Sequence, residues 1–218
     1  MQASPIQTPP SSAAAANRAI TCFTPGSAIT TLNGKINVCD LTVGNRVLTR
    51  DRGFQPVRWI GRRQLQARDI LDNAPIHIRA GALGPGMPDR DMVMSPRHRV
   101  LTTNRGTLRA LGETEALVEA AALLGQPGIT RITPRKLTYI HVLFDQHEVI
   151  HSDNIWSESF HLSSATARAL LRDQHTDLIR IFPGIAAPDA DDPQRPARAC
   201  LSAQDWADLR SDQGAVPA

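Results

Sequence analysis

Residues 28–38, with the sequence AITTLNGKINV, decide the fold class of this 218-residue chain. Two short β-like runs, residues 28–32 and 35–38, flank the pair Asn33-Gly34. Asn and Gly both tolerate the positive φ angles that a two-residue hairpin turn requires. The stretch therefore predicts a β-hairpin.

Short β-like runs continue on the C-terminal side of the hairpin, separated by turn residues. They cover residues 46–49, 55–60, 92–103, 139–144 and 148–151. Residues 113–124 are compatible with either a short helix or a strand followed by a turn. Strands at intervals of roughly 8 to 12 residues are typical of closed or sandwich-like β structures, so the sequence predicts an all-β domain.

Both ends of the chain differ from this β-rich part. Residues 1–21 contain prolines and a Ser/Ala stretch without an amphipathic period, which predicts a flexible leader or linker. Beyond residue 162, Ala and Leu recur at helical spacing in residues 164–171 and 203–209. We therefore divide the chain into a leader at 1–21, a β domain at 22–162 and a small helical extension at 163–218.

Composition limits the classes of function. The chain is 41% hydrophobic, and no apolar run approaches the roughly 18 to 20 residues of a membrane helix. The first 21 residues lack the pattern of a secretory signal, so we expect a cytoplasmic monomer without membrane contact. The net charge is +3, the arginines are dispersed and only 4% of residues are aromatic, so no nucleic-acid partner is expected. No Gly-rich phosphate loop follows a predicted strand, so no organic cofactor is expected.

The three cysteines, Cys22, Cys39 and Cys200, form no CxxC pair, which argues against a disulfide framework and a structural zinc site. We interpret Cys39 and Cys200 as packing residues. Cys22 lies where the leader meets the predicted domain, and its thiol could attack the Thr21 carbonyl and turn the Thr21–Cys22 amide into a thioester. The alternative is a small buried hydrophobe, because a thiol with a pKa of about 8.5 needs an assisting neighbour.

His98 is the candidate neighbour, in the tetrapeptide Ser95-Pro96-Arg97-His98. An imidazole can give a proton to the amide nitrogen that leaves as an amine. The Ser95 hydroxyl, three residues earlier, can hold either that ring or the scissile amide. A histidine with a purely structural role is the alternative.

At these positions the sequence resembles the Hint family, the self-processing domain shared by hedgehog proteins and inteins, in a form similar to bacterial Hint-domain proteins. Four blocks in the family's order carry the resemblance. They are residues 22–29, which open with the cysteine; residues 40–49; residues 95–98, where the family has Thr-x-x-His; and residues 141–158.

The resemblance covers residues 22–162 and implies a horseshoe-shaped all-β fold with pseudo-twofold halves that brings Cys22 next to His98. It also implies an N-to-S acyl shift at Cys22, followed by cleavage of the thioester by water, a thiol or an amine. The substrate is then the chain's own N-terminal segment. Cys22 is the implied nucleophile, His98 the proton donor and Ser95 the residue that positions the scissile amide. With 21 residues before Cys22, we expect either release of a short leader or a module whose original partner has been lost.

Two positions depart from the family pattern. His141 stands where many inteins have an acidic residue that tunes the first step; it can move a proton there or simply bond a backbone carbonyl. Splicing inteins end in His-Asn, whereas Ser157-Glu158 stands at that place, so we expect cleavage without splicing. A Hint-fold module that no longer cleaves and serves in binding or structure is the second hypothesis.

One further group of residues lies close to His141 in sequence. Asp145, His147 and His151 would share one face of a strand, so a metal cluster is an alternative interpretation. Nothing in the sequence fixes their relative geometry, and we predict no metal site.

Overall fold

The computed structural model describes residues 21–66, 70, 73–103, 112–163, 166–167, 170, 172–186 and 192–211. Residues 1–20 of the predicted leader and most of the predicted helix at 164–171 lie outside this description. Thr21, the first described residue, is the last residue of the predicted leader.

The largest sheet has nine strands in the order β14-β9-β8-β13-β12-β1-β3-β4, with β2 paired to β1. Strand β12 also pairs with β3, and the described strands do not close into a barrel. The bounds are β1 (Ala28–Thr31), β2 (Gly34–Asn37), β3 (Arg46–Thr49), β4 (Gly53–Pro56), β8 (Arg99–Thr102), β9 (Ala116–Glu119), β12 (Val149–Ser152), β13 (Ile155–Glu158) and β14 (Ala199–Leu201).

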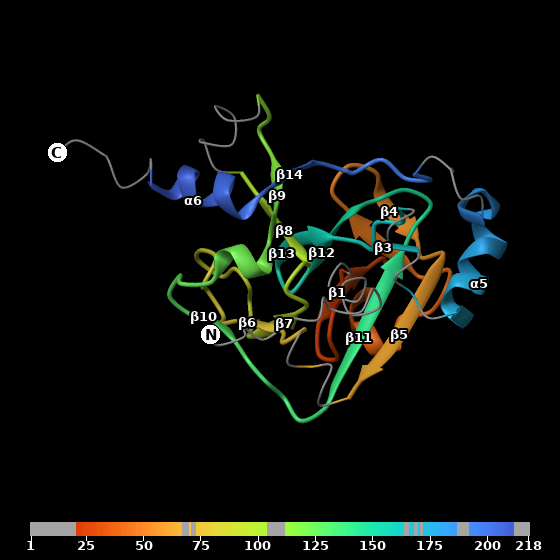
Figure 1. Cartoon of the computed structure of the whole chain (residues 1–218), viewed down its shortest axis with the longest axis horizontal. Coiled ribbons are helices and arrows are strands. Elements are labelled where there is room, and N and C mark those ends of the chain that lie inside the picture. The colour runs from red at the N-terminus through yellow and green to blue at the C-terminus, as the bar shows by residue number, and fades with distance from the viewer. Residues whose placement is uncertain are drawn as a thin grey trace, which may run out of the picture.

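Two smaller sheets complete the β structure. One is three-stranded, in the order β10 (Ile129–Arg131), β6 (Ile76–Ile78) and β7 (Met92–Met94). The other pairs β5 (Trp59–Leu65) with β11 (Leu137–Leu143) in an antiparallel ladder, and Figure 1 shows these two long strands side by side. Strand β11 carries His141 into the centre of the molecule, where its exposed fraction is 1%.

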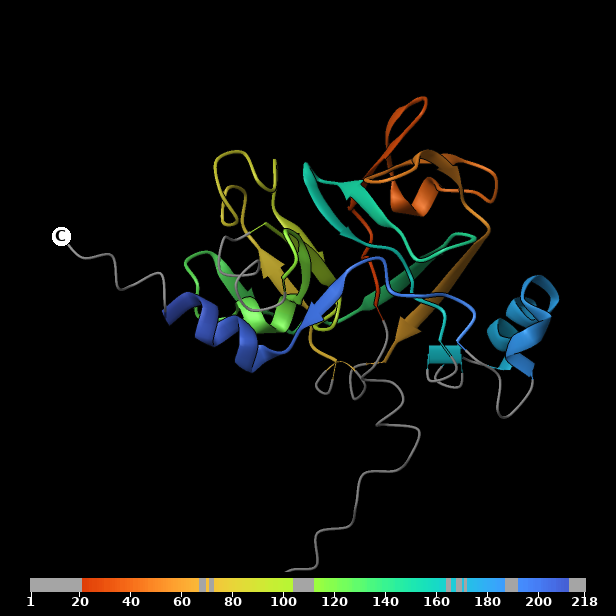
Figure 2. The same ribbon diagram turned by 90° about the horizontal axis from the view of Figure 1, so that it is seen from above.

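Helices are short and lie at the periphery. Figures 1 and 2 both show α5 (Arg172–Ile181) and α6 (Ala203–Ser211) at opposite sides of the β structure. Three 3₁₀ turns accompany them, at η1 (Val38–Asp40), η2 (Ala120–Leu123) and η3 (Pro183–Ala186). Within the described ranges, none of the helices has the length and apolarity needed to cross a membrane.

The predicted all-β architecture is confirmed, and a hairpin opens it as predicted, with Leu32-Asn33 as its two-residue loop in place of Asn33-Gly34. Ala28 pairs with Asn37 and Thr31 with Gly34, whose φ of +104° suits glycine. Residues 113–124 form the strand β9 followed by the turn η2, the second of the two alternatives left open by the sequence.

Two local predictions are wrong, and one is incomplete. Residues 55–60 form parts of two strands, because β4 pairs with β3 while β5 turns away to pair with β11. The C-terminal extension contains the helices α5 and α6, as predicted, and in addition a strand, β14, that pairs in parallel with β9. Cys39 and Cys200 are exposed and are not packing residues.

Candidate active site

Cys22 is held between two sheets, and its exposed fraction is 2%. The next residue, Phe23, forms antiparallel bridges with Met94 at the end of β7 and with Ile140 in β11. The Phe23 N–H donates to the Ile140 carbonyl and the Ile140 N–H to the Phe23 carbonyl, both at 2.9 Å. The Ser95 N–H donates to the Cys22 carbonyl at 3.1 Å. The backbone around Cys22 is therefore fixed on both sides.

A tight turn between β7 and β8 presents Ser95 and His98 to the same residue. The His98 N–H donates to the Ser95 carbonyl at 3.1 Å, and Pro96 occupies the second position of this turn, where its fixed φ is favourable. The Cys22 N–H donates to Ser95 Oγ at 3.0 Å. His98 Nδ1 lies 2.9 Å from the carbonyl oxygen of Cys22. The ring of His98 thus contacts the carbonyl of Cys22, whereas Ser95 holds the nitrogen of the Thr21–Cys22 bond.

His141 approaches the same peptide bond from β11. Its Nδ1 lies 2.9 Å from the carbonyl oxygen of Thr21 and 3.4 Å from Cys22 Sγ. The ring stacks on Trp59, with a centroid separation of 6.2 Å and an interplanar angle of 7°, so its orientation is fixed by packing. The structure therefore brings Cys22, Ser95, His98 and His141 together, although the turn between β7 and β8 carries Ser95 and His98 and strand β11 carries His141.

Burial sets the charge states in this site. Desolvation raises the pKa of the Cys22 thiol, against smaller lowering effects of the Ser95 hydrogen bond and the Arg63 charge. Desolvation lowers the pKa of His141 to about 4 and also lowers that of His98. At neutral pH the thiol is protonated and both imidazoles are neutral. A neutral imidazole beside a thiol can accept its proton when the sulfur attacks a carbonyl.

Glu158 is a part of the site that our sequence analysis treated only as a departure from the intein pattern. Its carboxylate is fully buried at the end of β13 and accepts a hydrogen bond from Thr21 Oγ1 at 2.7 Å. Burial opposes its ionisation, but the His147 hydrogen bond and the Arg99 charge hold its pKa at about 2. Two features of the sequence could have pointed to Glu158. It is an acidic residue at the end of a strand, and an arginine, Arg99, directly follows His98.

The three residues considered as a metal cluster have separate partners. Asp145 pairs with Arg58, His147 with Glu158, and His151 with the Thr30 hydroxyl. In the described part of the chain, no three His, Cys, Asp or Glu side chains gather closely enough to hold a metal ion.

A family profile described as the Hint domain matches residues 21–164, so the chain belongs to the Hint domain family. No curated protein matches the chain. Among solved structures it is similar to a bacterial intein-like domain from Clostridium thermocellum, with 13% identity, a TM-score of 0.46 and coverage of 63% of this chain and 97% of the other. It is also similar to the gp41-1 intein, with 14% identity, a TM-score of 0.40 and the same two coverages. A DnaB intein from Synechocystis sp. shows 13% identity, a TM-score of 0.39 and coverage of 64% and 98%.

Proposed function

We propose that this Hint domain converts the Thr21–Cys22 peptide bond into a thioester by an N-to-S acyl shift and then cleaves it without splicing. One observation carries the proposal: this peptide bond is contacted at both of its polar ends. His141 Nδ1 lies at the Thr21 carbonyl oxygen, and Ser95 Oγ accepts from the Cys22 N–H. Any buried peptide bond needs partners for its N–H and its C=O, but here both partners are side chains, and the ring of His141 also lies 3.4 Å from the sulfur.

In the first step, Cys22 Sγ forms a bond to the carbonyl carbon of Thr21. The thiol proton passes to His141 Nε2, which lies 3.9 Å from the sulfur; the ring is neutral because its pKa is about 4. The Nδ1–H of the same ring donates to the oxygen of Thr21, 2.9 Å away, where negative charge develops.

In the second step, the bond between the Thr21 carbon and the Cys22 nitrogen breaks as the nitrogen gains a proton. Ser95 holds that nitrogen, and His98, once it has taken up a proton from solvent, is the donor that we assign; His141 returns to solvent the proton that it took from the thiol. The ring of His98 now contacts the carbonyl oxygen of Cys22, so donation requires a shift toward the nitrogen of the same residue. The products are a free amine on Cys22 and a thioester on its sulfur, which water, a thiol or an amine then cleaves.

The proposal is tested by intact-mass measurement of the purified chain with and without dithiothreitol, beside Cys22→Ala as the matched control. We expect thiol to release residues 1–21 from the wild type and to leave Cys22→Ala at full length. If both proteins stay at full length over days at neutral pH, the acyl shift does not occur.

Splicing is excluded from the proposal because Ser157-Glu158 replaces the His-Asn pair whose asparagine would have to cyclise. We expect the chain to be cleaved only at the Thr21–Cys22 bond. A ligated species that joins the segments on both sides of residues 22–158 would contradict this part of the proposal.

The alternative, a Hint-fold module that no longer cleaves and acts in binding or structure, has one observation in its favour. Cys22 belongs to a buried apolar cluster that also contains Trp59, Phe160, Leu178 and Ile185. Because the last two come from the C-terminal extension, that segment helps to cover the sulfur. The mass measurement decides between the two hypotheses, since a binding module predicts no cleavage under any thiol concentration.

A further inference from the structure

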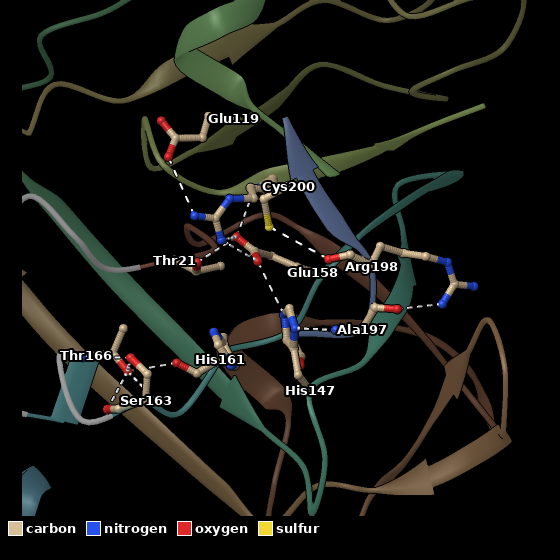
Figure 3. Close-up of polar contacts among 12 residues, drawn as sticks. Thr21, Glu119, His147, Glu158, His161, Ser163, Thr166, Ala197, Arg198 and Cys200 are labelled. Atoms are coloured by element: carbon tan, nitrogen blue, oxygen red, sulfur yellow. Dashed lines mark hydrogen bonds and ion pairs between the residues drawn. The ribbon is translucent and has the colours of Figure 1, made fainter. Parts of the chain in front are cut away.

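The side chain of Thr21 occupies a polar site of its own, separate from the apolar surroundings of Cys22. Figure 3 shows Thr21 and His147 on either side of Glu158, each in contact with its carboxylate. Thr21 has an exposed fraction of 7%, and Glu158 has 0%. The residue on the N-terminal side of the scissile bond is therefore enclosed by the folded domain.

The hydrogen-bond partners of Glu158 define what this enclosure accepts. One carboxylate oxygen, Oε1, accepts from Thr21 Oγ1 at 2.7 Å and from the Arg99 backbone N–H at 3.0 Å. The other, Oε2, lies 3.1 Å from Arg99 Nη1 and 3.3 Å from His147 Nε2. An ionised carboxylate can only accept hydrogen bonds, so each group that faces it must be a donor. The donor that comes from the residue before the scissile bond is the side-chain hydroxyl of Thr21.

We infer that Glu158 is a specificity-determining residue that recognises the side-chain hydroxyl of the residue preceding the nucleophilic cysteine. The inference rests on the proposed function and gives it a substrate class: leader segments that end in Thr or Ser. Valine has the shape of threonine but would take one of two donors from a buried carboxylate oxygen and leave it only the Arg99 backbone N–H. An aspartate there would face Glu158 with a second negative charge.

This recognition bears on the reaction through the position of the carbonyl group. Thr21 is held at two points, its hydroxyl by Glu158 and its carbonyl oxygen by His141. Two anchors on one residue restrict rotation of the carbonyl that Cys22 attacks, and such restriction favours reaction. Glu158 therefore acts as a positioning residue, since none of its atoms takes part in bond making.

The test compares Thr21→Ser and Thr21→Val, each in the wild-type and the Glu158→Gln background, by the rate of dithiothreitol-induced cleavage. With Glu158 present, we expect Thr21→Ser to cleave at least 10-fold faster than Thr21→Val, the size of effect that one hydrogen bond to a charged group can produce. In Glu158→Gln this ratio should fall to about 3-fold or less. Thr24→Val is the matched control, because Thr24 Oγ1 donates to the neutral carbonyl of Val93 at 2.7 Å. Its effect should be equal in both backgrounds.

Each outcome is decisive. An equal Ser-to-Val ratio in the two backgrounds overturns the inference while the wild type still cleaves. If the wild type never cleaves, the proposed function fails, and thermal unfolding of the same variants tests the contact itself. A shift in melting temperature caused by Thr21→Val that disappears in Glu158→Gln then supports recognition of the hydroxyl by Glu158. If Thr21→Val shifts the melting temperature equally in the wild-type and the Glu158→Gln backgrounds, the inference is overturned.

Discussion

The Ser95 hydroxyl accepts a hydrogen bond from the backbone N–H of Cys22 at 3.0 Å, although 73 residues separate the two. Both ends of this contact are buried, so water cannot replace it. The hydroxyl is therefore placed at the nitrogen that must leave if the proposed acyl shift occurs.

The first prediction follows from that contact. In Ser95→Ala the Cys22 N–H has no side-chain acceptor at this point, and we expect the rate of thiol-induced cleavage to fall about 10-fold. Ser95→Thr keeps the hydroxyl and should cleave within about 3-fold of the wild type. Intact-mass time courses at fixed dithiothreitol measure both rates. Equal rates for the alanine and threonine variants would remove Ser95 from the mechanism.

The second prediction concerns acid stability. The pKa of His141 is about 4 in the folded chain against an ordinary value of 6.5, so the unfolded chain binds more protons between these pH values. The free energy of unfolding therefore falls as the pH drops from 6.5 to 4, by up to on the order of 3 kcal/mol. Burial lowers the pKa of His98 as well, which adds a loss of the same sign.

Glu158 responds to acid over a lower range. Its pKa is about 2 in the folded chain against 4.5 ordinarily, so its contribution is present above pH 4.5 and is lost as the pH falls through 2. Urea unfolding at pH 7, 6 and 5, above the range in which Glu158 responds, isolates the histidine effect. His141→Gln should make the dependence less steep than in the wild type. If the free energy of unfolding of His141→Gln falls with pH as steeply as that of the wild type, the acid sensitivity does not come from His141.

Local sequence chemistry predicted most of the β structure and part of the site. The Asn33-Gly34 pair places the first hairpin to within one residue, since Leu32-Asn33 connect the two strands and only Gly34 has a positive φ. The Ser95–His98 spacing matches a turn whose hydrogen bond closes between those two residues. Strand β14 could not be predicted in this way, because its three residues adopt the β conformation by pairing with β9, more than 80 residues earlier. Glu158 was missed for a similar reason: its partners come from three separate parts of the chain.

The third prediction separates the cysteines by their reactivity. Cys39 is exposed and should react readily with iodoacetamide in the folded protein. Cys22 is buried and its pKa is raised, so its labelling should be slower by at least 100-fold. A Cys39→Ser, Cys200→Ser variant allows Cys22 to be followed alone by mass. Labelling of Cys22 at the rate of Cys39 would contradict its placement in the apolar cluster.

Slow labelling would not by itself favour an inert module. The proposed attack is intramolecular, on the carbonyl of the adjacent residue, and needs no entry of a reagent from solvent. Reactivity toward an external reagent and the acyl shift are thus separate properties of the same thiol.

The fourth prediction concerns how the C-terminal extension is attached. Gln194 is 3% exposed and joins two buried backbone groups: its Nε2 donates to the Phe144 carbonyl at 2.8 Å, and its Oε1 accepts from the Leu162 N–H at 2.9 Å. In Gln194→Ala both groups lose their partner in the dry interior. Each unpaired group costs about 1 to 3 kcal/mol, so we expect the free energy of unfolding to fall by about 2 to 4 kcal/mol.

Urea unfolding of Gln194→Ala measures this loss, and Gln64→Ala, at an exposed position of β5, is the matched control with an expected change within about 0.5 kcal/mol. Leu162 also packs in the cluster that contains Cys22, so loosening this attachment should make the sulfur more accessible. We therefore expect Gln194→Ala to speed the labelling of Cys22 by iodoacetamide under native conditions as well. A destabilised protein whose Cys22 still labels at the wild-type rate would show that the extension covers the sulfur independently of Gln194.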